Sequence, residues 1–181
     1  MVQLDTSWLQ HVQKPARYTG GEYNSIVKDH STVDVTMALG FPDVYEVAMS
    51  HLGIKILYGL VNRREDAVAE RVFAPWHDME EEMRKRNIPL FSLETRTPIK
   101  DFDVLAFTLQ YEMSFTNILN MLDLAGIPMY AKERDLDFPL LVCGGPCAYN
   151  VEPIADFFDI VSLGESEEWG DEFIDLFKAE K

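Results

Sequence analysis

Short apolar runs alternate with longer amphipathic segments along most of this chain, and that alternation restricts its fold more than any other feature. Five runs have the length and the apolar, β-branched content of buried strands, namely 33–41, 67–73, 102–110, 138–145 and 159–164. Strands that alternate with helices pair in parallel, through right-handed crossovers that place helices on both faces of the sheet. We therefore predict an α/β fold, a doubly wound and mainly parallel five-stranded sheet of flavodoxin type with strand order 2-1-3-4-5.

The segments between these strands show helical spacing of apolar residues or helix-favouring charge. The predicted helices are 50–62, 76–87, 114–126, a short one at 151–158 and a closing one at 165–181. Ser50 is a plausible N-cap for the first of them, and Gly126 suits the end of the third. The segment PLFSLE, residues 89–94, could add a short piece at the sheet edge.

Composition supports one domain and argues against two classes of partner. A chain of 181 residues with 47% hydrophobic residues can bury a sizeable core. We expect residues 1–30 to form an irregular lead-in and residues 31–181 to form the domain. Ten acidic residues and two lysines stand between 152 and 181, a balance that opposes binding to nucleic acid. The chain has no apolar run near the ~20 residues of a membrane span and no export signal at its start, so we expect no membrane partner and a cytoplasmic location.

Four loops are expected to carry any ligand site, because open parallel sheets bind ligands beyond the carboxyl ends of their strands. They are residues 42–53, 108–114, 143–150 and 164–168. All four follow predicted strands, so they should lie on one rim of the sheet, near the point where the strand order reverses between the first and third strands.

Two cysteines four positions apart, Cys143 and Cys147, supply only the first interval of the C-x3-C-x2-C motif that holds a [4Fe–4S] cluster, and position 150 is Asn. Two thiolates are too few for such a cluster, so we predict no metal site on them. Gly144 and Gly145 between them lack a Cβ where the strand meets the rim. They permit either close approach of a flat ligand or phosphate, or simply a tight turn.

Several stretches resemble the N-terminal region of a family of cobalamin-binding-domain radical S-adenosylmethionine proteins of uncharacterised substrate. They are KPARYTGGEYN, FPDVYEVAMSHLGIKILYGLVN, ERVFAPWHDMEEEMR, PLFSLET, FTLQYEMSFTNILNMLDLAGIP and GGPCAYNVEPIADFFDIVSLGESEE. The resemblance implies a cobalamin-binding-type domain that precedes a partial barrel, its partner. That barrel would hold the [4Fe–4S] cluster and S-adenosylmethionine, so the resemblance implies that this chain by itself is not catalytic.

The implied cofactor site lies on the rim, without a protein ligand to cobalt, and we predict that it includes Met49, Ser50, His51, Gly53, Thr108, Gln110, Tyr111, Gly144, Gly145, Pro146, Gly164 and Glu165. The motif D-x-H-x-x-G, which supplies a cobalt ligand in other cobalamin proteins, occurs at none of the four histidines. His51 lies in the appropriate loop, where it could cap a helix, contact a ligand or ligate cobalt, and we favour the first two. The alternative is a ligand-free module of flavodoxin type that docks a partner domain.

Overall fold

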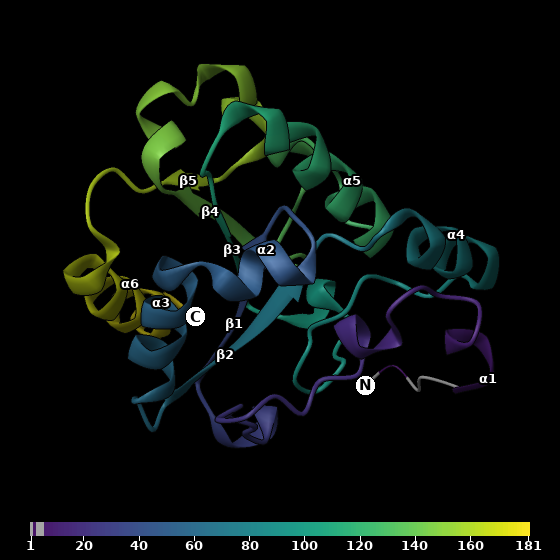
Figure 1. Ribbon diagram of the computed structural model, residues 1–181. Coiled ribbons are helices and arrows are strands. Elements are labelled where there is room, and N and C mark those ends of the chain that lie inside the picture. The colour runs from purple at the N-terminus through teal and green to yellow at the C-terminus, as the bar shows by residue number, and fades with distance from the viewer. Residues whose placement is uncertain (1, 3–5) are drawn as a thin grey trace.

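A computed structural model describes residue 2 and residues 6–181 of the chain (Figure 1). Its sheet has five strands, all parallel, in the order β2-β1-β3-β4-β5, as the sequence predicts. The strands are β1 Val35–Phe41, β2 Ala67–Phe73, β3 Val104–Thr108, β4 Leu140–Gly144 and β5 Ile160–Val161. The last strand has two residues where the sequence predicts six, because Ser162 already begins the loop that leads to the final helix.

Helices cover both faces of the sheet (Figure 1). They are α1 Thr6–Leu9, α2 Tyr45–Ser50, α3 Leu52–Asn62, α4 His77–Arg86, α5 Phe115–Ala125 and α6 Ser166–Glu180. Short 3-10 turns occupy Pro15–Tyr18, His30–Thr32, Ile99–Asp101, Glu112–Ser114, Ala131–Glu133, Pro146–Asn150 and Glu152–Phe157. In the part of the chain that is described, no helix combines the length and the apolar character needed to cross a membrane.

Side chains alternate along each strand and so build two separate cores. On one face Leu105 and Leu141 join Ile118 and Leu122 of α5 and the two methionines of α4. On the other face Met37 and Leu39 of β1 pack with residues of α3 and α6. We call these the α4–α5 face and the α3–α6 face.

Two local predictions are corrected by the structure, and a third is refined. Ser50 does not cap α3: it ends the additional helix α2, and its Oγ donates to Val47 O at 2.7 Å. The residue in the N-cap position of α3 is His51, whose side chain makes no capping hydrogen bond. Residues 89–94 form no strand, only one antiparallel bridge between Phe91 and Pro98. The predicted helix 151–158 is a 3-10 helix, Glu152–Phe157.

The outer edge of β2 is closed by side chains and by the loop after α4. Leu93 N donates to Arg71 O at 2.7 Å, and Glu94 accepts hydrogen bonds from both the backbone and the guanidinium of Arg71. The buried carboxylate of the neighbouring Glu70 accepts hydrogen bonds from the hydroxyls of Ser92 and Thr95. The backbone N–H and C=O of Arg71 are thus paired, whereas an exposed edge strand would offer such groups to another chain.

The described part of the lead-in packs against the domain. Trp8 and Val12 are buried in the core of the α4–α5 face. Further along, Lys28 Nζ donates to three backbone oxygens around the start of β2, including Ala67 O at 2.7 Å. The lead-in therefore contributes to the core although it supplies no strand within the described residues.

Candidate functional site

The four predicted loops all leave the carboxyl ends of the strands. Parallel register aligns Phe41 with Phe73, Gly40 with Phe107, and Thr108 with Gly144, so the strand ends lie along one edge of the sheet. We call this edge and the loops that leave it the rim. Because every strand points the same way, the sequence placed these loops together correctly.

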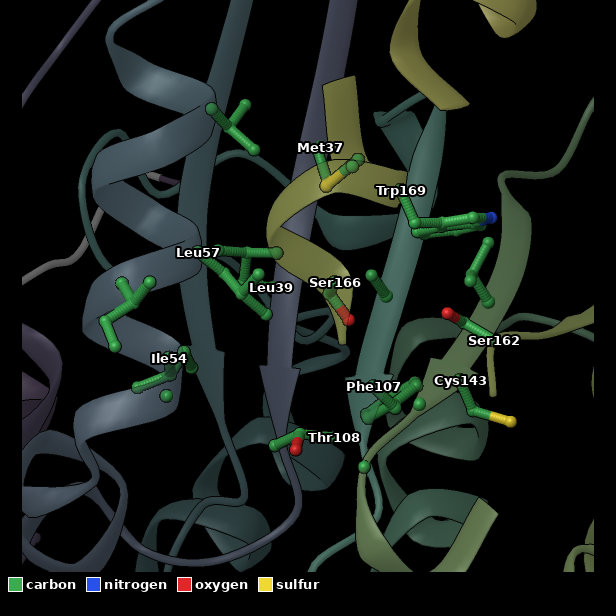
Figure 2. A pocket seen from close by; sticks show the side chains of 18 of the residues that line it. Met37, Leu39, Ile54, Leu57, Phe107, Thr108, Cys143, Ser162, Ser166 and Trp169 are labelled. Carbon is green, nitrogen blue, oxygen red and sulfur yellow. The ribbon is translucent and has the colours of Figure 1, made fainter. Parts of the chain in front are cut away.

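Below the rim, a slot of about 240 Å³ lies between the sheet and the helices α3 and α6 (Figure 2). Its floor is formed by side chains of the central strands, and its walls come from the two helices. The apolar lining includes Met37, Leu39, Ala106, Val142, Ile54, Leu57, Trp169, Phe173 and Ile174. The slot opens to solvent at the rim, where it is bordered by the exposed residues Gly164, Glu165 and Glu167.

Three polar side chains stand in a row where the slot meets the rim. His51 Nε2 lies 3.1 Å from Gln110 Oε1, and Gln110 Nε2 donates to Thr108 Oγ1. This arrangement places the imidazole proton on Nε2 and leaves Nδ1 as an acceptor. Nδ1 is buried and bonds to no described residue. Burial of an unpaired acceptor costs about 1–3 kcal/mol, so this atom marks a place where a donor is missing.

Gly53 explains how the imidazole fits. A Cβ on residue 53 would lie 2.9 Å from Cε1 of His51 and 3.3 Å from its Nδ1. The imidazole also packs against the ring of Phe41, with ring centroids 5.2 Å apart. His51 is therefore held in a fixed orientation by its neighbours rather than by a capping bond.

Eight of the twelve predicted residues line the slot, and four do not. The eight are His51, Gly53, Thr108, Gln110, Gly144, Gly145, Gly164 and Glu165. Among the others, Met49 Sδ lies 3.2 Å from Arg71 Nη1, and Ser50 bonds its own helix. Tyr111 is exposed and donates to Asp43 at 3.4 Å, and the exposed Pro146 begins a 3-10 turn.

The two positive-φ glycines of the rim differ in what surrounds them. Gly145 has φ +104°, and a Cβ there would lie 3.0 Å from Leu109 O, so this glycine makes a tight turn against the loop after β3. Gly164 has φ +106° with nothing within 4 Å of the missing Cβ. The Gly-Gly turn was expected either to admit a ligand or to form a tight turn, and the contacts of Gly145 favour the tight turn.

Gly170 is a slot residue that the sequence analysis missed. It stands inside α6, where glycine is unfavourable by about 1 kcal/mol relative to alanine. It lines the slot, and nothing lies within 4 Å of its missing Cβ. The hydroxyls of Ser162 and Ser166 also border the slot (Figure 2). A glycine in the middle of an amphipathic helix was the one available signal, and the predictions did not use it.

The two cysteines have different surroundings. Cys143 is fully buried and belongs to the core of the α4–α5 face, where burial raises the pKa of its thiol to about 12. Cys147 is partly exposed, and burial together with Glu112 raises the pKa of its thiol. Among the residues that the structure describes, no group of three His, Cys, Asp or Glu side chains could hold a metal ion.

Comparison with known proteins bears on the origin of this domain. The family described as "Radical SAM proteins, N-terminal" matches residues 53–181. An uncharacterised protein of Methanocaldococcus jannaschii is 27% identical over 134 residues, which cover 72% of this chain and 24% of that protein. The chain thus spans about a quarter of the length of the relative that it matches. Because the family match covers most of the chain, including β2 to β5, α6 and the slot lining other than His51 and the β1 residues, the chain belongs to the family of N-terminal regions of radical SAM proteins.

Proposed function

We propose that this domain binds cobalamin at the rim, without a protein ligand to cobalt, and presents it to a downstream radical SAM barrel in a longer protein. The observation that carries the proposal is the apolar slot that opens at the rim beside a row of polar side chains. In this proposal the barrel holds the [4Fe–4S] cluster and S-adenosylmethionine, and the present chain binds and orients the cofactor.

The size of the slot matches one part of cobalamin. Small-molecule pockets usually measure about 300–1,000 Å³, and the slot is somewhat smaller. It is therefore suited to the aromatic base of the nucleotide tail, between the indole of Trp169 and the apolar side chains of the sheet. The broad corrin would lie outside it, on the rim.

Polar groups at the slot mouth suit the rest of the cofactor. Thr108 and Gln110, which line the slot, can bond the amide groups that fringe a corrin. The hydroxyls of Ser162 and Ser166 can bond the sugar and phosphate of the tail. When bound, cobalamin supplies a cobalt ion that changes oxidation state and carries an alkyl group.

His51 is poorly placed to ligate cobalt. Its Nε2 is engaged by Gln110, and its Nδ1 is buried against Gly53. Coordination through either nitrogen would require the ring to leave its position beside Phe41. The site therefore fits cobalamin held by its periphery better than cobalamin held by its metal.

The test is titration with hydroxocobalamin, followed by its visible spectrum. Gly170→Leu puts a side chain into the slot and should weaken binding at least about tenfold, equivalent to 1.4 kcal/mol. Gly59→Leu is the matched control, because Gly59 also lies inside a helix with open space around it but does not line the slot. Gly145→Val is unsuitable, since its strained turn would be disturbed with or without a ligand.

A second variant tests the role of the histidine. His51→Ala should leave the spectrum of the bound cobalamin unchanged, because cobalt has no histidine ligand in the proposed complex. Loss of a histidine-ligated spectrum in this variant would restore the cobalt-ligand hypothesis. If the parent binds no cobalamin even when joined to its natural downstream sequence, the alternative of a ligand-free docking module is favoured instead.

A further inference from the structure

Each strand of the sheet is followed at the rim by at least one exposed apolar side chain. Leu52, Met113, Tyr149 and Leu163 follow β1, β3, β4 and β5, and they are 68%, 82%, 76% and 64% exposed. Trp76, 42% exposed, follows β2. Because the strands are adjacent in the order β2-β1-β3-β4-β5 and all point the same way, these side chains follow one another along the rim. We call these five residues the rim arc.

The helical surface of the α4–α5 face has a different character. Within α4 and α5 no large hydrophobic residue is exposed among those described, and charged pairs such as Arg84 with Asp123 lie there instead. Exposed apolar side chains that gather in one place mark interaction sites, whereas single ones scattered over a surface need no explanation. The rim arc is therefore a candidate interface.

Charge indicates what kind of surface fits it. Glu112 stands beside Met113, and Glu165 and Glu167 stand just after Leu163. None of these three carboxylates pairs with a base among the described residues. A complementary surface would be apolar at its centre and carry Lys or Arg at its border.

We propose that the rim arc is the docking surface for the downstream part of the same protein chain, through an apolar patch bordered by basic residues. The matched family is an N-terminal region, and the relative from Methanocaldococcus jannaschii is about four times as long as the segment that matches. A covalently linked domain meets the rim at high effective concentration, so a modest apolar arc suffices. The proposal rests on the proposed function only in naming the downstream barrel as the partner.

The experiment measures hydrogen–deuterium exchange in the full-length protein without cobalamin. Met113→Glu with Leu163→Glu forms the rim pair. Leu136→Glu with Leu176→Glu forms the control pair, since both leucines are exposed outside the rim arc. Amides in residues 109–114 and 145–150 should exchange at least about tenfold faster in the rim pair than in the parent or the control pair.

Equal exchange in all three proteins would overturn the proposal, as would a natural reading frame that stops after Lys181. Protection that depends on protein concentration would overturn it too, because a second copy would then cover the rim. Far-ultraviolet circular dichroism checks that both pairs fold. Because cobalamin is absent from this measurement, docking can fail while the cofactor titration succeeds, and the reverse is equally visible.

Discussion

The two faces of the sheet are built from the same strands but filled to different degrees. On the α4–α5 face Leu105, Ile118, Met121 and Leu122 are 0% exposed and pack against one another in one cluster. On the α3–α6 face the side chains also form one cluster, but a slot of about 240 Å³ remains between the helices and the sheet. Well-packed interiors leave few voids larger than a water molecule. The difference indicates that the α4–α5 face contributes more to stability, whereas the α3–α6 face retains an open cavity.

The largest expected effect compares the same substitution on the two faces. Leu122→Ala in α5 should lower the free energy of unfolding by about 3 kcal/mol, within the range for fully buried leucines. Leu57→Ala in α3 should cost clearly less, about 1 kcal/mol, because its side chain borders the slot and is only partly buried. Urea denaturation of both variants measures the two losses. Equal losses would mean that the slot closes in solution.

A second comparison predicts opposite signs for two glycines. Gly126→Ala at the end of α5 should destabilise the protein by about 1 kcal/mol, because its φ of +69° suits glycine. Gly170→Ala in α6 should stabilise it by up to about 1 kcal/mol, because alanine favours the helix and its methyl group meets only open space. Thermal unfolding of both variants measures the two changes in stability. A destabilised Gly170→Ala would show that α6 packs more tightly than the structure describes.

A smaller, pH-dependent effect concerns the ion pairs that fasten α6 beside α3. Arg64 bonds Asp66 at 2.9 Å and also pairs with Asp171 and Asp175 of α6, and Lys178 bonds Asp66 at 3.1 Å. The bonds from Arg64, followed by Lys178, hold the pKa of Asp66 well below its usual range.

Because the folded-state pKa is lowered, this stabilisation is present above the unfolded pKa of about 4 and is lost as pH falls below it. Asp66→Asn should therefore cost up to about 1 kcal/mol at pH 7 and less at pH 3. Asp123→Asn is the control, because it removes a partner of Arg84 on the other face and leaves the ion pairs of α6 in place. The measurement is urea denaturation at both pH values. A loss that is the same at pH 3 and pH 7 would contradict the role given to Asp66.

The smallest effect leaves stability unchanged and compares the two thiols. In the native protein a disulfide reagent should modify Cys147 slowly and leave Cys143 unmodified, because Cys143 is buried and its thiol has a pKa of about 12. After unfolding both should react. Rapid modification of both thiols in the native protein would mean that the structure around Cys143 opens readily.

Most of the fold could be predicted from the sequence, because it depends on periodicity. The run AVAERVF became β2 with the predicted limits, and the parallel direction of all five strands placed the four loops on one rim. The helix α2 was missed since its six residues are too few to show an amphipathic period. Ser50 was predicted to be an N-cap because the sequence did not reveal α2, the helix that Ser50 ends.

The slot itself could not be predicted in the same way. Its volume depends on how far α6 stands from the sheet, which no single residue determines. Thr108, Gln110 and His51 were found because they lie at or after the carboxyl ends of strands, but their hydrogen-bonded row requires the loop after β1 and the loop after β3 to meet. The contact of Gly145 with Leu109 likewise joins two loops, so the sequence left open whether that turn served a ligand or the backbone.

The direction of α6 has a mechanical consequence. The helix starts at the rim and ends at the opposite edge of the sheet, where Lys181 Nζ lies 2.7 Å from Asp103 Oδ1, just before β3. Its 15 residues span about 22 Å at 1.5 Å per residue. A following segment that returns to the rim therefore needs at least about seven extended residues. In the proposed longer protein, the segment that leaves α6 would be attached far from the slot mouth, so a domain that covers the rim would be able to move aside without losing its attachment.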